Sequence, residues 1–186
     1  MKRYGIQCVV GMSAKRDIQY TRALEIAEDF LAKTKDLYRK AEIAGSLRRK
    51  EPVVHDIDFA VIPSIEDMSV WKEKVEEKSK KIGATPKSFG ETICDLIYKD
   101  TQINLFICKS EDTWGVVLMW ATGPKGHTIG MTIKAQKKGL IYSMKGIFTR
   151  EDPQKLIPTR TEEDVARILD WKYKPPETRG KNTTHS

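Results

Sequence analysis

Residues 45–58 read GSLRRKEPVVHDID, and this stretch decides the fold and the chemistry that the chain can support. Gly45 and Ser46 at a tight turn can present backbone N–H groups and a hydroxyl to a phosphate, while Arg48 or Arg49 neutralises its charge. At the other end, two aspartates stand two residues apart in an expected strand, so their side chains point to one face. Two carboxylates on one face repel each other unless a cation lies between them.

The residues around the aspartates indicate a buried strand. Residues 56–63, DIDFAVIP, have the aromatic and β-branched content of a strand and end at a proline. Acids at the mouth of a buried strand are natural ligands for Mg²⁺, which prefers a few carboxylates plus substrate phosphate oxygens. Taken alone, an Asp-x-Asp motif is most simply explained as part of a solvent-exposed polar face. A glycine-serine turn near arginines is also common and carries little information alone. Together the two halves predict a triphosphate–metal site, because phosphoryl transfer needs little beyond positioned metal, phosphate donors and an acceptor.

The rest of the chain predicts an α+β fold. Apolar periodicity indicates helices at 17–38 (with Ser13 as N-cap), 66–82, 112–121, 124–138 and 162–171. Strands are expected at 41–45, 56–63, 87–90, 92–98, 101–108, 140–143 and 146–149. Strands with helices beside them, in no regular alternation, favour α+β.

A third position completes the polar face. In residues 101–108, TQINLFIC, the side chains of Gln102, Asn104 and Phe106 share one face of a strand. Asn104 can therefore reach toward the aspartates from a neighbouring strand, at a place where an acid would make chemical sense.

Composition narrows the class of protein. The 186 residues carry 33 Lys and Arg against 26 Asp and Glu, so the net charge of +7 attracts a polyanion without specifying which. The three cysteines form no CxxC pair and the three histidines no zinc spacing, which predicts a reduced intracellular protein without structural zinc. No apolar run approaches the length of a membrane span, and the start lacks the features of a signal peptide. We expect a cytoplasmic protein, or a nuclear one where the host has a nucleus.

G-S-x-R-R followed by D-x-D at this spacing resembles the nucleotidyltransferase superfamily, in particular the family X DNA polymerases typified by DNA polymerase beta. Residues 120–140, WATGPKGHTIGMTIKAQKKGL, are similar to the family's thumb-entry Thr-Gly stretch, and residues 168–180, ILDWKYKPPETRG, to its C-terminal ending. The similarity runs from about Ser13 to Gly180. It implies a nucleotidyltransferase palm at 1–120, with a mixed or antiparallel sheet and flanking helices, and a small α/β thumb domain for nucleotide binding at 121–186.

The resemblance also assigns roles. Ser46 and Arg49 would hold the β and γ phosphates of a dNTP, with Gly45 shaping the turn. Asp56 and Asp58 would bridge two Mg²⁺ ions, for which Mn²⁺ can substitute, about 3.5–4 Å apart. The family's third catalytic carboxylate, also a metal ligand, falls on Asn104. The sugar and base of the nucleotide would be lined by Trp120, Ala121, Thr122 and Gly123.

The departures from the family pattern matter. Asn is isosteric with Asp, but its amide is neutral and half of it is a donor. We expect a nucleotide and its metal still to bind, and the chemical step to be strongly impaired. Because the other residues of the motif are intact, we favour an engineered replacement of Asp by Asn at position 104 over a natural one. Ala121 stands where the family has a bulkier aromatic, although Trp120 restores bulk, so discrimination against a ribose 2′-hydroxyl is expected to be loose.

The residues expected to contact the DNA template also depart from the family pattern, which makes template dependence a weaker expectation. Thr128 and Thr132 replace larger polar residues that touch the base pair and template in relatives, although threonine is equally ordinary on a helix face. Lys134, Lys138 and Lys174 would follow DNA phosphates, or lie on a solvated face.

The resemblance implies a monomeric repair polymerase that extends a primer in short gaps of DNA and does not act at a membrane. Larger relatives carry an N-terminal lyase domain and DNA clamps that nothing before Ser13 can form, so the chain is similar to the reduced polymerases of some viruses, which places it in a viral factory if the host is eukaryotic. Two alternatives stay open: a nucleotidyltransferase acting on a small molecule, protein or tRNA end, and a non-catalytic nucleic-acid-binding protein.

Overall fold

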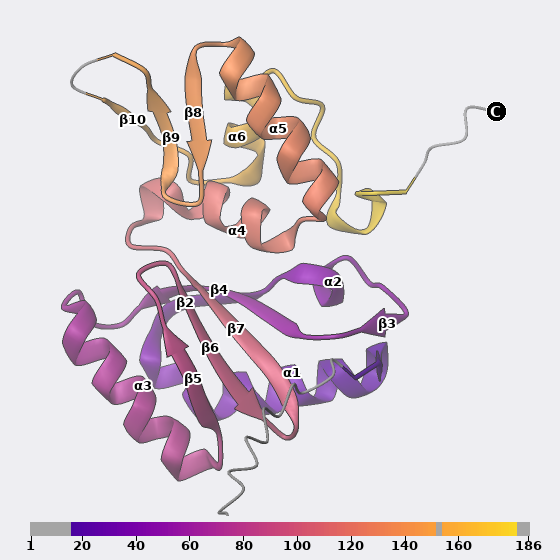
Figure 1. Cartoon of the computed structure of the whole chain (residues 1–186), viewed down its shortest axis with the longest axis vertical. Helices are drawn as coiled ribbons and strands as arrows, with labels where there is room; N and C mark the ends of the chain where they lie inside the picture. The colour runs from indigo at the N-terminus through magenta and orange to yellow at the C-terminus, as the bar shows by residue number, and fades with distance from the viewer. Residues whose placement is uncertain (1–15, 152–153, 182–186) are drawn as a thin grey trace, which may run out of the picture.

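The computed structural model describes residues 16–151 and 154–181, so the expected N-cap Ser13 lies outside the described residues. Figure 1 shows two lobes, one above the other. The lower lobe holds residues 16–113, and the upper lobe holds the described residues from 114 onward. Helix α4 (Trp114–Thr122) lies along the boundary between them (Figure 1).

A five-stranded mixed sheet forms the centre of the lower lobe. Its strand order is β2-β4-β7-β6-β5, and only the central pair β4–β7 is parallel. Helices α1 (Tyr20–Thr34) and α3 (Met68–Ile82) supply apolar side chains to the core on one face. The strands are β2 (Tyr38–Ile43), β4 (Ile57–Pro63), β5 (Thr85–Phe89), β6 (Ile93–Tyr98) and β7 (Thr101–Ile107). Two short strands, β1 (Ile18–Gln19) and β3 (Val53–Val54), pair beside this sheet.

The alternation of side chains in β4 decides where the site lies. Phe59 and Val61 pack into the core with α1 and α3, whereas Ala60 and Ile62 pack in a separate cluster with Trp114 of α4. Successive side chains of a strand point to opposite faces. Asp58 therefore lies on the face that α4 and the upper lobe overlook.

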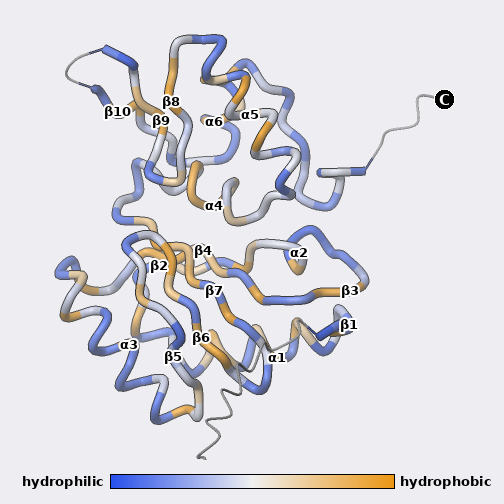
Figure 2. The backbone as a smooth tube through the Cα atoms, in the orientation of Figure 1, coloured by the Kyte–Doolittle hydropathy of each residue, from blue (hydrophilic) through white to orange (hydrophobic). Residues whose placement is uncertain are grey.

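The upper lobe packs helices against a three-stranded antiparallel sheet. Its core joins residues of α4, α5 and α6 with the sheet β10-β9-β8. Figure 2 shows apolar residues concentrated in the sheet strands and α4, while α3 is mostly hydrophilic. The elements are α5 (Lys125–Lys137), β8 (Leu140–Ser143), β9 (Gly146–Thr149), β10 (Leu156–Ile157) and α6 (Glu162–Ile168), with short 3-10 turns at Lys35–Leu37, Glu111–Thr113 and Pro176–Thr178.

Helix α4 belongs to both lobes. Val116 and Met119 pack in the upper core, and Val117 and Leu118 pack against the sheet of the lower lobe. The domain boundary expected between residues 120 and 121 falls inside this helix, and the division stays a prediction.

The expected α+β class is confirmed, and several element boundaries are corrected. The helix predicted at 17–38 spans only α1, because the chain turns at residues 35–37 and Tyr38 begins strand β2. The expected tight turn at Gly45 is the start of a four-residue helix, α2 (Gly45–Arg48). Strand β4 begins at Ile57, so Asp56 lies in the bend before it. Helix α6 ends at Ile168, three residues earlier than predicted.

None of the helices within 16–151 and 154–181 is long and apolar enough to cross a membrane.

Candidate nucleotide and metal site

The glycine-serine turn lies directly against Asp58. Gly45 has a φ of 61°, and a Cβ atom placed on it would stand 2.0 Å from Asp58 Oδ2. Only glycine accommodates both that backbone conformation and that contact. The backbone N–H of Ala44 donates to the carbonyl oxygen of Asp58 over 2.7 Å, which fixes the turn to the strand. The sequence pattern GSLRR thus becomes a backbone segment in contact with a carboxylate.

Asn104 is the neighbour of Asp58 in the sheet. Asn104 lies on the strand next to Asp58, as expected, and the two residues are register partners in the parallel pair β4–β7. Asn104 Nδ2 donates to Asp58 Oδ1 over 2.7 Å, and Asn104 Oδ1 accepts from Gln102 Nε2 over 2.8 Å. Asp95 stands opposite Asn104 in β6 and accepts from Ser88 Oγ over 2.7 Å. A row of polar side chains therefore crosses four strands on the face below α4.

The donor set suits a cation that shares its shell with a substrate. Asp56 and Asp58 are both half-buried at the start of β4. Within the described part of the chain, no three His, Cys, Asp or Glu side chains gather in a metal-binding arrangement. Two carboxylates beside a turn that is expected to bind phosphate are nevertheless what Mg²⁺ uses when substrate phosphates complete its coordination. The residues present fit such an ion, with the carbonyl oxygen of Asn104 turned away from Asp58.

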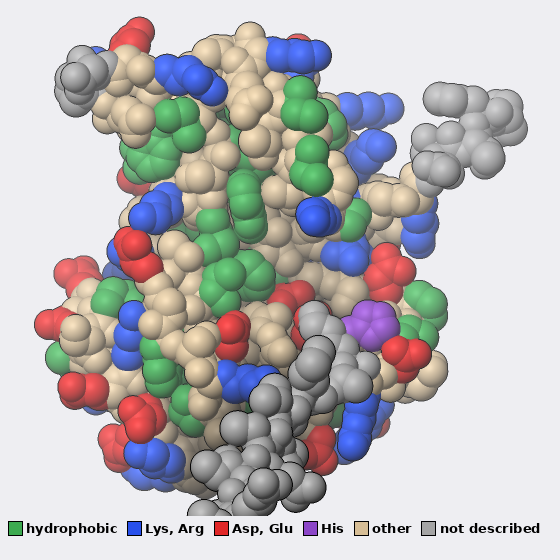
Figure 3. Space-filling view, in the orientation of Figure 1, with side chains coloured by type: hydrophobic (Ala, Val, Ile, Leu, Met, Phe, Trp, Pro, Cys, Tyr) green, Lys and Arg blue, Asp and Glu red, His purple; other side chains and the backbone are tan. Residues whose placement is uncertain are grey.

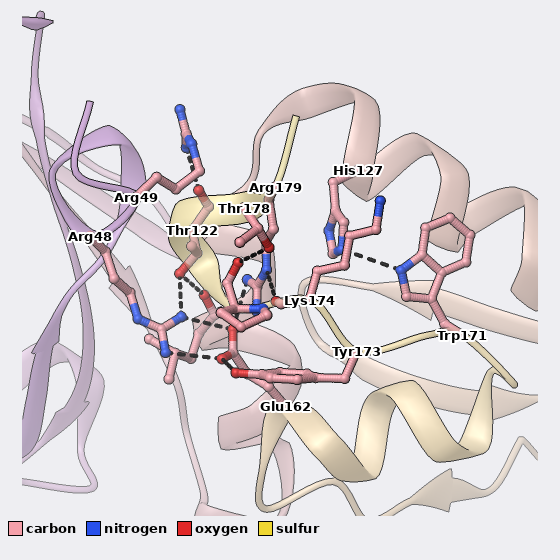
Figure 4. A network of polar contacts seen from close by, with 12 residues as sticks. Arg48, Arg49, Thr122, His127, Glu162, Trp171, Tyr173, Lys174, Thr178 and Arg179 are labelled. Atoms are coloured by element: carbon pink, nitrogen blue, oxygen red, sulfur yellow. Dashed lines mark hydrogen bonds and ion pairs between the residues drawn. The ribbon is translucent and has the colours of Figure 1, made fainter. Parts of the chain in front are cut away.

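The two arginines after the turn have different tasks. Arg48 donates to both carboxylate oxygens of Glu162, over 2.8 and 2.9 Å, and to Thr122 Oγ1 over 2.8 Å (Figure 4). Glu162 is 4% exposed and also accepts from Arg179 Nη1 over 3.0 Å. Burial raises the pKa of Glu162, but the hydrogen bonds from the two arginines outweigh it, so the pKa lies below its ordinary value. Through these hydrogen bonds to Thr122 and Glu162, Arg48 joins the lower lobe to the upper lobe.

Arg49 links the turn to the upper lobe in another way. Its guanidinium donates to the carbonyl oxygen of Thr122, at the end of α4 (Figure 4). Its Nε lies 3.6 Å from Glu51 Oε1, which is a longer approach than Arg48 makes to Glu162. Of the two arginines, Arg49 is thus the one whose charge is less neutralised by a carboxylate, and its contact with phosphate stays a prediction. Ser46, two residues from Arg48, is half-buried in the same short helix.

The residues expected to line the nucleotide do not all face one way. Trp120 packs on Tyr142 with ring centroids 5.2 Å apart and is partly buried against the upper core. Ala121 is 6% exposed, and Thr122 Oγ1 donates back to the carbonyl of Leu118 over 2.6 Å. Gly123 has a φ of 61° and begins the turn into α5. The nucleotide contacts of these four residues stay a prediction.

Helix α5 presents a mixed surface. Thr128 and Thr132 are half-buried, and the Thr132 hydroxyl donates to the Thr128 carbonyl over 3.0 Å. Ile129 and Ile133, which the sequence analysis did not single out, are 48% and 47% exposed on this helix. An i, i+4 apolar pair was visible in the sequence, but only the packing shows that it faces outward.

Basic residues lie on α5, at its end and in the C-terminal segment. Lys134 lies 3.4 Å from Asp170, Lys138 is exposed at the end of α5, and the carbonyl of Lys174 accepts from Arg179 Nε over 2.8 Å. Figure 3 shows Lys and Arg side chains gathered on the side of the upper lobe formed by α5 and the C-terminal segment. This charge distribution suits a polyanion, and the individual DNA contacts stay a prediction.

The sequence is similar to known proteins over most of its length. Residues 117–180 match the family model for the DNA polymerase beta thumb. The chain is 29% identical over 142 residues to the repair DNA polymerase X of African swine fever virus (isolate Tick/South Africa/Pretoriuskop Pr4/1996), covering 73% of this chain and 78% of that protein. It is 25% identical over 175 residues to the repair DNA polymerase X of the isolate Tick/Malawi/Lil 20-1/1983, covering 90% and 97%.

Proposed function

We propose that this chain, which is similar to the DNA polymerase beta thumb and to viral repair DNA polymerase X proteins, is a family X DNA polymerase acting in repair. It would add a dNTP to a primer 3′-hydroxyl in short gaps of DNA. The observation that carries this proposal is the position of Asp58, which touches the phosphate-binding turn on one side and Asn104 on the other.

Each part of the site has a chemical task. Asp56 and Asp58 would hold two Mg²⁺ or Mn²⁺ ions, which when bound activate the attacking hydroxyl and stabilise the leaving pyrophosphate. The Gly45–Ser46 segment and Arg49 would bind the β and γ phosphates. Since Arg49 also bonds the Thr122 carbonyl, the segments expected to hold the phosphates and the sugar are joined to each other. Positioning of this kind supplies most of the catalysis of phosphoryl transfer.

Asn104 is proposed to weaken the chemical step. Its Nδ2 group, and not an anionic oxygen, faces Asp58. The site thus carries one negative charge fewer than one with three carboxylates. We infer that a nucleotide with its accompanying cation is still bound, and that the ion beside the primer hydroxyl is held less well.

Primer extension on gapped DNA tests the proposal. Wild type and Asn104→Asp should both bind a dNTP in the presence of Mg²⁺, and the substitution should raise the rate of extension by at least about 100-fold. Asp95→Asn, on the same face of the neighbouring strand, is the matched control for a carboxylate of the site's surroundings and should leave dNTP binding nearly unchanged. Absence of any gain from Asn104→Asp would remove Asn104 from the catalytic site.

The same assays separate the alternatives. Mg²⁺-dependent nucleotide binding without extension of any primed duplex, even after Asn104→Asp, would favour a nucleotidyltransferase with another acceptor. DNA binding with no Mg²⁺-dependent nucleotide binding would favour a non-catalytic relative. An enzyme that repairs DNA would work in the cytoplasm, in a nucleus or in a viral factory, and its oligomeric state is proposed to be monomeric.

A further inference from the structure

Two neighbouring side-chain amides on β7 have their orientations fixed by chemistry. Asp58 Oδ1 can only accept, so the atom of Asn104 that lies 2.7 Å from it must be Nδ2. The other end of the same amide, Oδ1, then faces Gln102 and must receive a hydrogen from Nε2, over 2.8 Å. The carboxylate of Asp58 thus determines the orientation of both amides.

The neighbours of this amide pair support the arrangement. Gln102 stands opposite Ile97 in β6, an apolar side chain that offers no competing hydrogen bond. Asp95, opposite Asn104, already accepts from Ser88 over 2.7 Å. The hydrogen bond that Gln102 Nε2 donates to Asn104 Oδ1 therefore links the two amide orientations on this face of the sheet.

We propose that Gln102 is a positioning residue, and that Gln102 and Asn104 form a paired-amide switch that reports on the cation at Asp58. This inference rests on the proposed function, because it concerns the metal site of that function. A cation beside Asp58 repels Nδ2 and attracts an oxygen. Asn104 then turns over to present Oδ1, and Gln102 turns over with it, so that Asn104 Nδ2 donates to Gln102 Oε1.

The switch conserves the hydrogen bond between the two amides in both orientations. What changes is the atom that Asn104 offers to Asp58: a donor in one orientation and a cation ligand in the other. A cation must therefore displace a charge-assisted hydrogen bond before Asn104 can ligate it. That competition is expected to lower cation affinity by about 10- to 100-fold relative to a pair already turned toward the ion.

A double-mutant cycle on Mn²⁺ affinity, measured by electron paramagnetic resonance without nucleotide or DNA, tests the inference. Gln102→Glu leaves only acceptors beside Asn104, which favours the orientation with Oδ1 toward the cation. The same substitution in an Asn104→Leu background measures the effect of the added charge alone. We expect an increase in Mn²⁺ affinity of about 30-fold with asparagine present and about 3-fold with leucine, a coupling of about tenfold. An equal increase in both backgrounds would overturn the paired-amide switch.

The controls separate this inference from the proposed function. Asp58→Asn should abolish Mn²⁺ binding; if wild type and Asp58→Asn bind Mn²⁺ alike, the metal site of the proposed function fails and the switch fails with it. If Asp58 is required but the cycle shows no coupling, only the switch fails. Asn104→Ala replaces Asn104→Leu should the latter not fold. A second readout is the ¹⁵N-labelled side-chain amide signals of both residues, which should shift together on addition of Mg²⁺; a shift of one without the other contradicts paired rotation.

Discussion

The contact between the turn at Gly45 and Asp58 makes a quantitative prediction for Gly45→Ala. The new Cβ would stand 2.0 Å from Asp58 Oδ2 and 3.0 Å from its Cβ, in a backbone with a φ of 61°. The left-handed conformation costs a non-glycine residue about 1–2 kcal/mol. Relieving the clash requires Asp58 to move, which adds about 1–3 kcal/mol. The expected loss of folding stability is therefore about 2–5 kcal/mol, and a loss of Mg²⁺-dependent dNTP binding should accompany it.

Gly83 provides the matched control. Its φ of 74° is also left-handed, but nothing lies within 4 Å of a Cβ placed on it. Gly83→Ala should therefore cost only the conformational part, about 1–2 kcal/mol. Thermal melts followed by circular dichroism compare the two variants without cation, and a dNTP titration with Mg²⁺ measures the site.

The difference between the variants isolates the contact with Asp58. In an Asp58→Gly background the side chain that causes the clash is gone, so the excess cost of Gly45→Ala over Gly83→Ala should disappear. If Gly45→Ala is no more destabilising than Gly83→Ala and dNTP binding is unchanged, the turn and the carboxylate are not in contact and Gly45 does not belong to the nucleotide site.

Four further outcomes are expected. Glu162→Gln leaves the buried Arg179 and the half-buried Arg48 without a counter-charge, so urea or thermal unfolding should show a loss of about 3–5 kcal/mol, and an unchanged midpoint would contradict a lobe-joining role. Burial lowers the pKa of His127 to about 4 from 6.5, so folding stability should fall by roughly 2 kcal/mol as the pH drops from 6.5 to 4; pH-dependent melts of His127→Gln should lack that part. Lys134→Ala should reduce the slope of log DNA affinity against log salt by about 0.9 while Lys81→Ala, on the exposed surface of α3, leaves it unchanged. Asn104→Asp should lower the melting temperature without cation and regain it on addition of Mg²⁺, whereas a variant that ignores Mg²⁺ would exclude a cation at this place.

Strand patterns predicted much of the lower lobe because burial imposes a period of two. Asp58 and Asn104 lie on the face opposite the α1 and α3 core, which Phe59 and Leu105 help to fill. The alternation was readable in residues 101–108, whereas in β4 the even-numbered Ala60 and Ile62 are buried as well, under α4. The parallel register that makes Asp58 and Asn104 direct partners was not readable, since it depends on how β4 and β7 meet across some forty intervening residues. The predicted end of the first helix at residue 38 was wrong for a similar reason. Leu37 and Tyr38 continue the apolar spacing of the helix, but they are buried where the chain enters the sheet.

The adjacent arginines show a second limit of prediction from the sequence. The letters GSLRR offer two equivalent cations, and only tertiary structure separates them. Arg48 faces Glu162, which comes from α6 more than a hundred residues later, whereas Arg49 faces a backbone carbonyl of Thr122. No local pattern identifies a partner at that separation. Likewise, Trp120 is next to the Thr-Gly stretch in sequence, yet its ring packs on Tyr142.

Charge balance connects these features. Glu162 carries one negative charge between Arg48 and Arg179, so this buried cluster keeps an excess of one positive charge behind the turn. Arg49 adds a second positive charge, which Glu51 at 3.6 Å partly offsets, and Asp56 and Asp58 supply two negative charges. A third carboxylate at position 104 would raise the affinity of the site for a second cation, but Asn104 is neutral and does not supply that negative charge. In the proposed function, this charge balance would favour a triphosphate and disfavour the cation beside the primer hydroxyl, so we expect nucleotide binding to survive and the chemical step to slow.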